Sequence, residues 1–354
     1  MESRVRRVTL TIFMCWLSLV SLGQSRLDSL IKEGICCESG FVIPNIDGMP
    51  LPKGVVITTE QARNFSLNSS FEQGDSSNSD RVSSLTSARI KLNIPLINND
   101  RFKLITGLKY YQDEYRFKQP EELSNFYHMG LEDKHIKTIG MSFYGLKTTL
   151  GQHYWAARLS VKLNGDFVAQ TLNSHMKSGL TLMYGKKSNR FKTWGMGLSY
   201  SNSFGVSSVY PVWFHKERYT NKFAIDLLLP VYAKLYYLPS NKKNVLYLEN
   251  RLEGDNYNLN FEAYPGTPLY LEKANVYSRL VYEREIHDFL WFSMSAGYQF
   301  NVRYNLSSSD LFFDRTPNPN NRTALLIESN VKPVPVVRLG LFLVPPRKWL
   351  EERM

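Results

Sequence analysis

Eight basic side chains lie in segments where apolar and polar residues alternate, and they carry the clearest chemistry in the sequence. They are Arg89, Lys91, Arg158, Lys162, Lys234, Arg251, Arg279 and Arg303. Successive side chains of an extended strand point to opposite faces, so each of these residues lies on its strand's polar face. If those faces line a water-filled lumen, the cations raise the local concentration of anions. Acidic residues in the same segments offset part of this charge: Asp226, Glu249, Glu253 and Glu283. We therefore expect a modest preference for small anionic solutes.

The sequence supports no catalytic, metal or cofactor site. Asn173-Ser174-His175 places a serine beside a histidine. Neighbouring extended residues face opposite ways, however, so chance explains this pair better than a nucleophile and its base. The six histidines are scattered without the close spacing of a structural metal site. Gly195-Met196-Gly197 lacks the third glycine of a dinucleotide-binding loop. We therefore predict that the protein is not an enzyme.

The segment that best shows how such residues are positioned runs from Leu290 to Leu306. Its even positions are all apolar or aromatic, and the positions between them are mostly polar or small. Soluble strands usually have about 5 to 6 residues, whereas a tilted strand needs roughly 9 to 11 to cross a bilayer. The length therefore predicts a transmembrane strand with its even residues on the lipid side. A soluble β-sandwich, whose buried face would alternate in the same way, is the alternative.

Residues 1–23 have the features of a cleaved export signal. Arg4, Arg6 and Arg7 precede a mostly apolar stretch, and Ser21-Leu22-Gly23 offers small residues for cleavage. No later stretch approaches the roughly 20 apolar residues that a spanning helix needs. An exported chain without such helices is either a closed barrel or soluble beyond the inner membrane.

Composition narrows the partners further. The formal net charge is +11, but the basic residues are dispersed along strands without a dense run, so nucleic acid is not expected as a partner. After cleavage only the adjacent Cys36 and Cys37 remain, which excludes a disulfide-stapled scaffold.

The mature chain divides into three parts. Residues 24–53 are irregular and rich in glycine and proline, and they either hang in the periplasm or fold into the lumen. Residues 54–345 form the barrel, with about 12 strands and a range of 10 to 14. One strand is expected over 222–238, with a bulge at Pro230. Residues 346–354 form a charged tail.

A long polar segment, Gln112 to Lys137, is predicted to be an outer loop between two strands. Its Phe126-Tyr127-His128 cluster can fold over the mouth of a pore. The preceding hairpin places Ala88 and Ile90 on one face and Arg89 and Lys91 on the other. This pattern is typical of lipid outside and charge inside.

The order of these features resembles a family of uncharacterised outer-membrane β-barrel proteins, known by a domain-of-unknown-function label. The resemblance rests on the export signal, Gly54-Val55-Val56-Ile57, the strand from Ala88 to Leu96, and Leu108-Lys109-Tyr110-Tyr111. It implies a barrel and no particular substrate. Many barrels of this class end on a strand with a terminal aromatic residue, whereas this chain continues past Phe342 through Pro345-Pro346.

Together these features predict a closed antiparallel transmembrane β-barrel in an outer membrane, in contact with its lipid. The expected function is a narrow channel or small-solute transport protein with a basic lumen. One alternative is a barrel whose lumen is plugged and which has a structural or binding role. The other is the soluble exported β-sandwich, acting as a binding module. Neither the solute nor the oligomeric state is indicated by the sequence.

Overall fold

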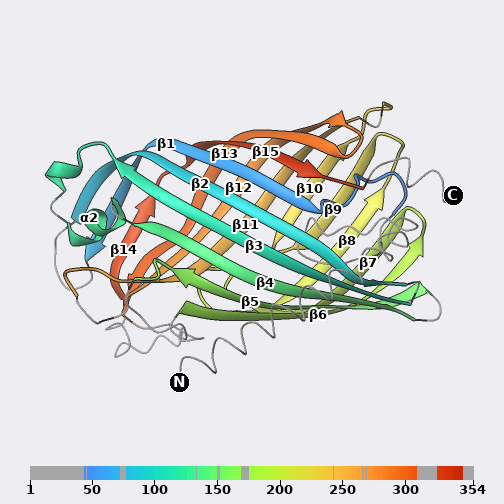
Figure 1. The fold of residues 1–354 in the computed structure, drawn as a ribbon, viewed down its shortest axis with the longest axis horizontal. Helices are drawn as coiled ribbons and strands as arrows, with labels where there is room; N and C mark the ends of the chain where they lie inside the picture. The colour runs from blue at the N-terminus through green and yellow to red at the C-terminus, as the bar shows by residue number, and fades with distance from the viewer. Residues whose placement is uncertain are drawn as a thin grey trace, which may run out of the picture.

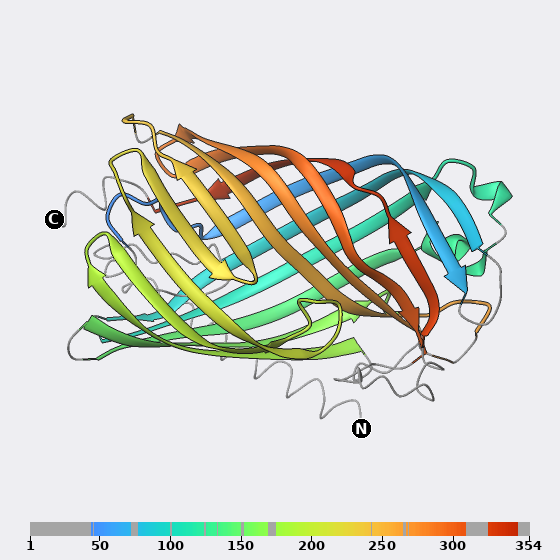
Figure 2. The same ribbon diagram turned by 180° about the vertical axis from the view of Figure 1, so that it is seen from behind.

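A single antiparallel sheet rolls up into a barrel in the computed structural model (Figure 1). Figure 2 shows the opposite side, where the yellow-green strands lie. The structure describes residues 44, 46–71, 77–99, 101–123, 125–132, 134–149, 152–168, 175–241, 243–264, 267, 269–308 and 325–345. The predicted signal peptide, most of segment 24–53 and the charged tail lie outside the described residues.

The wall consists of strands joined in chain order. They are β1 (Val55–Phe71), β2 (Ser77–Asn98), β3 (Phe102–Phe117), β4 (His135–Thr148), β5 (His153–Gly165), β6 (Met176–Asn189), β7 (Lys192–Ser201), β8 (Ser208–Arg218), β9 (Phe223–Leu229), β10 (Tyr232–Tyr237), β11 (Asn244–Leu259), β12 (Leu269–His287), β13 (Leu290–Ser307), β14 (Leu325–Val331) and β15 (Val334–Leu343). Between β3 and β4 lie the short helices η2 (Pro120–Glu122) and α2 (Phe126–Glu132).

The barrel closes completely over the described part of the chain. From β1 to β13 each strand pairs with its neighbours in sequence, and β1 pairs with both β14 and β15. Because β14 and β15 both run between β1 and β13, they occupy one position, and the described wall has 14 strands. This confirms the closed antiparallel barrel within the predicted range. A single closed sheet also excludes the two-sheet sandwich.

The prediction of one strand over 222–238 is wrong. The chain turns back at Pro230 and Val231, where the Val231 amide donates a 2.7 Å hydrogen bond to the Leu228 carbonyl. β9 and β10 form a tight hairpin there, with Leu228 opposite Tyr232. Proline has no amide to give to a ladder and suits a turn. Apolar residues occupy the odd positions both before and after this turn. The periodicity therefore continues through the turn and did not reveal it.

Side chains alternate between lumen and outside along β13, but only as far as Val302. Met294, Tyr298 and Val302 are exposed on the outer face, while Ser295 is buried inside. The pairing with β12 then slips between Ala274 and Asn275, which marks a β-bulge. Beyond the slip, Tyr304 and Leu306 are buried in the barrel interior. Their predicted place on the lipid side is wrong, because a one-residue slip exchanges the two faces.

The outer face of the wall is apolar around the barrel. Large side chains exposed there include Ile90 on β2, Trp155 on β5, Leu198 on β7, Leu280 on β12 and Leu341 on β15. A closed barrel satisfies every strand edge and can present such a face to lipid. The protein is therefore a transmembrane barrel.

None of the helices in the described part of the chain has the length and apolar character that crossing a membrane requires.

Replacing Ala296 with Arg tests the assignment of the two faces. Ala296 is exposed on the outer face of β13, and Ser295 points into the barrel. We expect Ala296→Arg to lower the free energy of unfolding by about 2 to 4 kcal/mol if the residue lies near the bilayer midplane. Ser295→Arg should lower the free energy of unfolding by clearly less. Urea unfolding in lipid vesicles measures both, and equal losses would contradict the assignment.

Two apolar clusters fill the ends of the barrel. The first, here called the cap cluster, contains Tyr127 and Leu131 of α2 together with inward residues such as Leu67, Val82 and Leu306. α2 therefore covers one end, as predicted for this loop (Figure 1). The second lies at the end where β1 begins and β15 ends, and is here called the terminal cluster.

In the terminal cluster, Ile46 and Met49 pack against Tyr247, Trp291 and Phe342. Segment 24–53 was predicted either to hang in the periplasm or to fold into the lumen. Residues 46–53 take the second position. An apolar cluster therefore lies towards each end of the barrel.

Candidate functional site: a basic cavity between two plugs

A cavity of about 300 Å³ lies between the two clusters. Ile136 and Tyr277 belong to both the cap cluster and the cavity wall. Tyr247, Val281 and Phe342 likewise join the wall to the terminal cluster. A water molecule takes about 30 Å³ of liquid, so roughly ten waters or one small solute would fill the space. This cavity, here called the chamber, is partly open and is bordered by the cap cluster on one side and by the terminal cluster on the other.

The charge of the chamber is positive. Among the described residues that line it, ten are basic and five are acidic, which leaves an excess of five positive charges. The basic ones are Lys53, Arg89, Lys91, Lys109, Arg158, Lys162, Arg251, Lys273, Arg279 and Arg338, and the acidic ones are Asp113, Glu249, Glu253, Asp255 and Glu283.

Six of the eight basic residues singled out in the sequence line the cavity: Arg89, Lys91, Arg158, Lys162, Arg251 and Arg279. Lys234 is buried beside Glu249, with 3.6 Å between its ammonium and the carboxylate, but does not border the cavity.

Arg303 lies elsewhere and does not border the cavity, contrary to its predicted place in the lumen. It follows the bulge in β13 and takes the face opposite to the buried Tyr304. There it forms a 3.2 Å ion pair with Glu272 and lies next to Gly205 of the 202–207 link.

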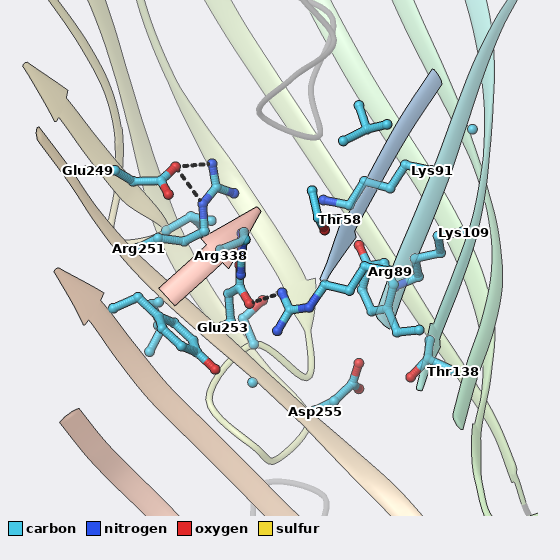
Figure 3. Close-up of a pocket in the computed structure, with 18 of the residues that line it drawn as sticks. Thr58, Arg89, Lys91, Lys109, Thr138, Glu249, Arg251, Glu253, Asp255 and Arg338 are labelled. Carbon is cyan, nitrogen blue, oxygen red and sulfur yellow. Dashed lines mark hydrogen bonds and ion pairs between the residues drawn. The ribbon is translucent and has the colours of Figure 1, made fainter. Parts of the chain in front are cut away.

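Four arginines and three glutamates reach across the cavity and are here called the arginine network: Arg89, Arg251, Arg279 and Arg338 with Glu60, Glu249 and Glu253. Arg279 lies 2.6 Å from Glu60 and 3.0 Å from Glu249. Arg338 binds Glu60 at 2.8 Å, and Arg251 binds Glu249 at 2.9 Å. Arg89 reaches Glu253, although β2 and β11 are not neighbours in the sheet (Figure 3). The network therefore ties opposite walls together and neutralises much of its own charge.

Two lysines without such partners lie on the β2 and β3 wall, beside Arg89 (Figure 3). Lys91 on β2 and Lys109 on β3 stand directly opposite each other in the strand register. Their ammonium groups lie 5.5 and 5.3 Å from the ring centre of Tyr111. Within the described residues, neither forms an ion pair with a carboxylate. Like charges directly opposite across two strands are destabilising, so this pair costs stability unless an anion neutralises it.

A third lysine extends this row across the sheet. Lys109 is aligned with Gly140 of β4, and Gly140 with Lys162 of β5. A Cβ atom on Gly140 would lie 2.6 Å from Lys109 Cε, so the glycine leaves room for the lysine to cross β4. Lys162 is held by Asp255 at 2.6 Å. Lys91, Lys109 and Lys162 are here called the lysine row.

Four basic lining residues were not singled out in the sequence: Lys53, Lys109, Lys273 and Arg338. Lys109 and Arg338 lie in predicted strands, at positions whose side chains point into the barrel. The alternation that identified Arg89 could therefore have identified them as well. Lys53 lies before the first strand in a segment with no periodicity. It reaches the lumen only because 46–53 folds back, and its ammonium lies 2.6 Å from Glu283.

A family model described as a domain of unknown function, DUF6268, matches residues 61–332. The chain belongs to this family. The matched region of this DUF6268 protein runs from within β1 to the end of β14 and contains most of the cavity wall. No curated protein matches the chain.

Several solved structures are similar to the chain over most of its length. A FadL homologue from Pseudomonas aeruginosa is 8% identical, with 83% of this chain and 91% of that chain covered and a TM-score of 0.38. An outer membrane channel from Pseudomonas putida F1 is 10% identical, with 86% and 100% covered and a TM-score of 0.38. The P. putida toluene transporter TodX is 7% identical, with 83% and 90% covered and a TM-score of 0.31.

Proposed function

We propose that this DUF6268 protein is a gated outer-membrane channel for small anions, and that the conformation described here is its closed state. The observation that carries the proposal is the chamber itself, which has an excess of five positive charges and an apolar plug at each end. Hydrophobic constrictions are a common way to close a pore, because water withdraws from them.

Opposed lysines support the choice of anions. Arginines of the network already have carboxylate partners, so they shape the chamber more than they attract a solute. Lys91 and Lys109 repel each other in a partly enclosed space, where electrostatic interactions are stronger than in bulk water. An anion between the two ammonium groups would relieve that repulsion, so binding of an anion in the chamber is favoured. Its size limits the solute to a small molecule or ion.

The lengths of the links support an orientation. Strand ends at the terminal cluster are separated by two or three residues in the sequence, at 99–101, 190–191 and 288–289. Strand ends on the side of α2 are separated by more residues, at 118–134, 166–175 and 308–324. Outer-membrane barrels have short periplasmic turns and longer extracellular loops. The cap therefore faces the cell exterior in this proposal, and segment 46–53 closes the periplasmic end. An export signal in residues 1–23 is part of the same proposal.

A second candidate function is favoured by the two plugs: a barrel that binds an anion without passing it. Single-channel recording of the refolded mature chain in a planar bilayer separates the two. Openings with an anion-selective reversal potential under a KCl gradient support the channel. A barrel that migrates as a folded species on unheated gels, binds anions and never conducts would replace the channel with the binding barrel.

Lys109→Glu should reduce the anion selectivity of the open channel. The substitution places a carboxylate opposite Lys91 and beside Lys162, so an opposite-charge pair replaces the unneutralised pair. The matched control is Lys147→Glu, which makes the same charge change at an exposed position near the end of β4. Reversal potentials of the three proteins test this. If both variants shift selectivity equally, the lysine row is not the site.

The same substitution should raise stability. An opposite-charge cross-strand pair replaces a like-charge pair, and such pairs contribute roughly 0.2 to 1 kcal/mol each. Urea unfolding of Lys109→Glu at low and high salt measures the gain, which should shrink as salt screens the charges. A loss of stability would mean that the lysines are not in conflict in the native barrel.

A further inference from the structure

A buried histidine ties the cap helix to the barrel wall. His128 of α2 is fully buried. Its Nε2 lies 2.9 Å from Ser69 Oγ on β1, and its Nδ1 contacts a carboxylate oxygen of Asp80 on β2. Ser69 in turn lies 2.8 Å, Oγ to Oγ, from Ser329 on β14. One imidazole thus connects α2 to two strands directly and to a third through Ser69.

The order of groups is that of a serine nucleophile, a histidine base and an aspartate that orients it. A nucleophile must reach a substrate, however, and Ser69 is only 1% exposed. It does not line the central cavity, and apolar residues of the cap cluster surround this end of the barrel. In this conformation the three residues hold the helix in place, and Ser69 has no access to a substrate.

We infer that His128 is a proton-operated latch: while its ring is neutral it holds α2 over the mouth, and acidification releases the helix. This inference rests on the proposed function, because it assigns the cap the role of a gate. The latch is built from hydrogen bonds of one ring to β1 and β2, so a change in that ring's charge acts directly on the contacts that fasten the cap.

The groups around the imidazole determine the direction of the effect. Asp80 is the charged side chain that contacts the ring. Phe117 of β3 stacks on it with 5.5 Å between ring centres, and Tyr127 of α2 lies beside it. Glu132, also on α2, is engaged by the Phe117 backbone amide. Burial lowers the pKa of His128 below its usual value, and Asp80 opposes this only in part.

Because the pKa is lower in the capped state than in water, protons bind more readily once the ring is exposed. The cap is therefore most stable above the ordinary histidine pKa of about 6.5 and weakens as pH falls below it. One proton per cap can change the ratio of open to closed molecules by about tenfold per pH unit at most.

Thiol labelling measures the cap without requiring conduction. In a background with Cys36→Ser and Cys37→Ser, Leu131→Cys places a probe in the cap cluster, and Met129→Cys places one on the exposed side of α2. Brief pulses of a methanethiosulfonate reagent, applied at a series of pH values from 8 to 5, give the labelling rate of each cysteine in the folded barrel in liposomes. Their ratio removes the intrinsic pH dependence of the thiol. We expect the relative labelling of Leu131→Cys to rise severalfold as pH falls.

Two histidine variants decide whether His128 is responsible. His128→Gln keeps a polar side chain that does not titrate, so the pH dependence should disappear, whether the cap is then looser or tighter. His135→Gln changes an exposed histidine of β4 and should leave the pH dependence of labelling unchanged. Persistence of the same midpoint in His128→Gln, or protection of Leu131→Cys at every pH, would overturn the latch. Acid-induced labelling would support the latch whether or not the barrel conducts, because the terminal cluster still closes the other end. A barrel that stays silent with both plugs removed would refute the channel without touching the latch.

Discussion

Replacing Arg279 with Met should destabilise the barrel by about 3 to 5 kcal/mol. Arg279 is 1% exposed and bridges Glu60 and Glu249 in the arginine network. Methionine fills similar space but leaves the carboxylates short of a cation inside the barrel. Arg338 and Arg251 still contact them, which keeps the expected loss nearer the lower end of this range. Urea unfolding in lipid vesicles gives the value.

The control for this prediction is Arg116→Met. Arg116 also pairs with a glutamate, Glu114, at 2.7 Å, but its side chain is 66% exposed. Exposed pairs contribute about 0 to 1 kcal/mol, so little change is expected. Glu60→Gln combined with Arg279→Met should recover part of the lost stability, because it removes one of the two buried carboxylates that lose their contact with Arg279. Similar losses for Arg279→Met and Arg116→Met would show that the network is not buried in the native membrane form.

The second large effect concerns the two plugs, which close the chamber in series. A mature chain beginning at Pro52 lacks Ile46 and Met49 of the terminal cluster but keeps Lys53 for Glu283. Leu131→Arg puts a charge into the cap cluster and should drive α2 out. Each change alone leaves the other plug in place. We expect little conductance from either and more than about a tenfold increase from their combination, because an apolar constriction closes a pore by dewetting.

Planar bilayer recording of the four proteins tests this arrangement. Met129→Arg, on the exposed side of α2, is the matched control for the charge and should leave the cap closed. If the shortened chain conducts fully by itself, then α2 does not close the mouth. If the combination remains silent while folded, the chamber has no path through it and the binding barrel is the better description.

By itself the sequence determined which residues face lipid and which face the lumen over most of the wall. Side-chain direction in a strand alternates residue by residue, so Ile90 and Arg89 are separated by covalent geometry alone. The same local rule identified six of the basic residues that line the cavity. The sequence also predicted the cap. An aromatic cluster in the long polar segment before β4 favours packing against the barrel over exposure to water.

Tertiary structure alone decided which side chains meet. Arg279 finds Glu60, and Lys91 stands opposite Lys109, because closure and strand register bring those positions together. Register depends on all the pairings of the sheet, and no local pattern encodes it. For the same reason the slip near Ala274 turned Arg303 away from the lumen, and the turn at Pro230 divided one predicted strand into two. Alternation decides the face of a residue, whereas the charge and shape of the chamber follow from contacts between strands far apart in the chain.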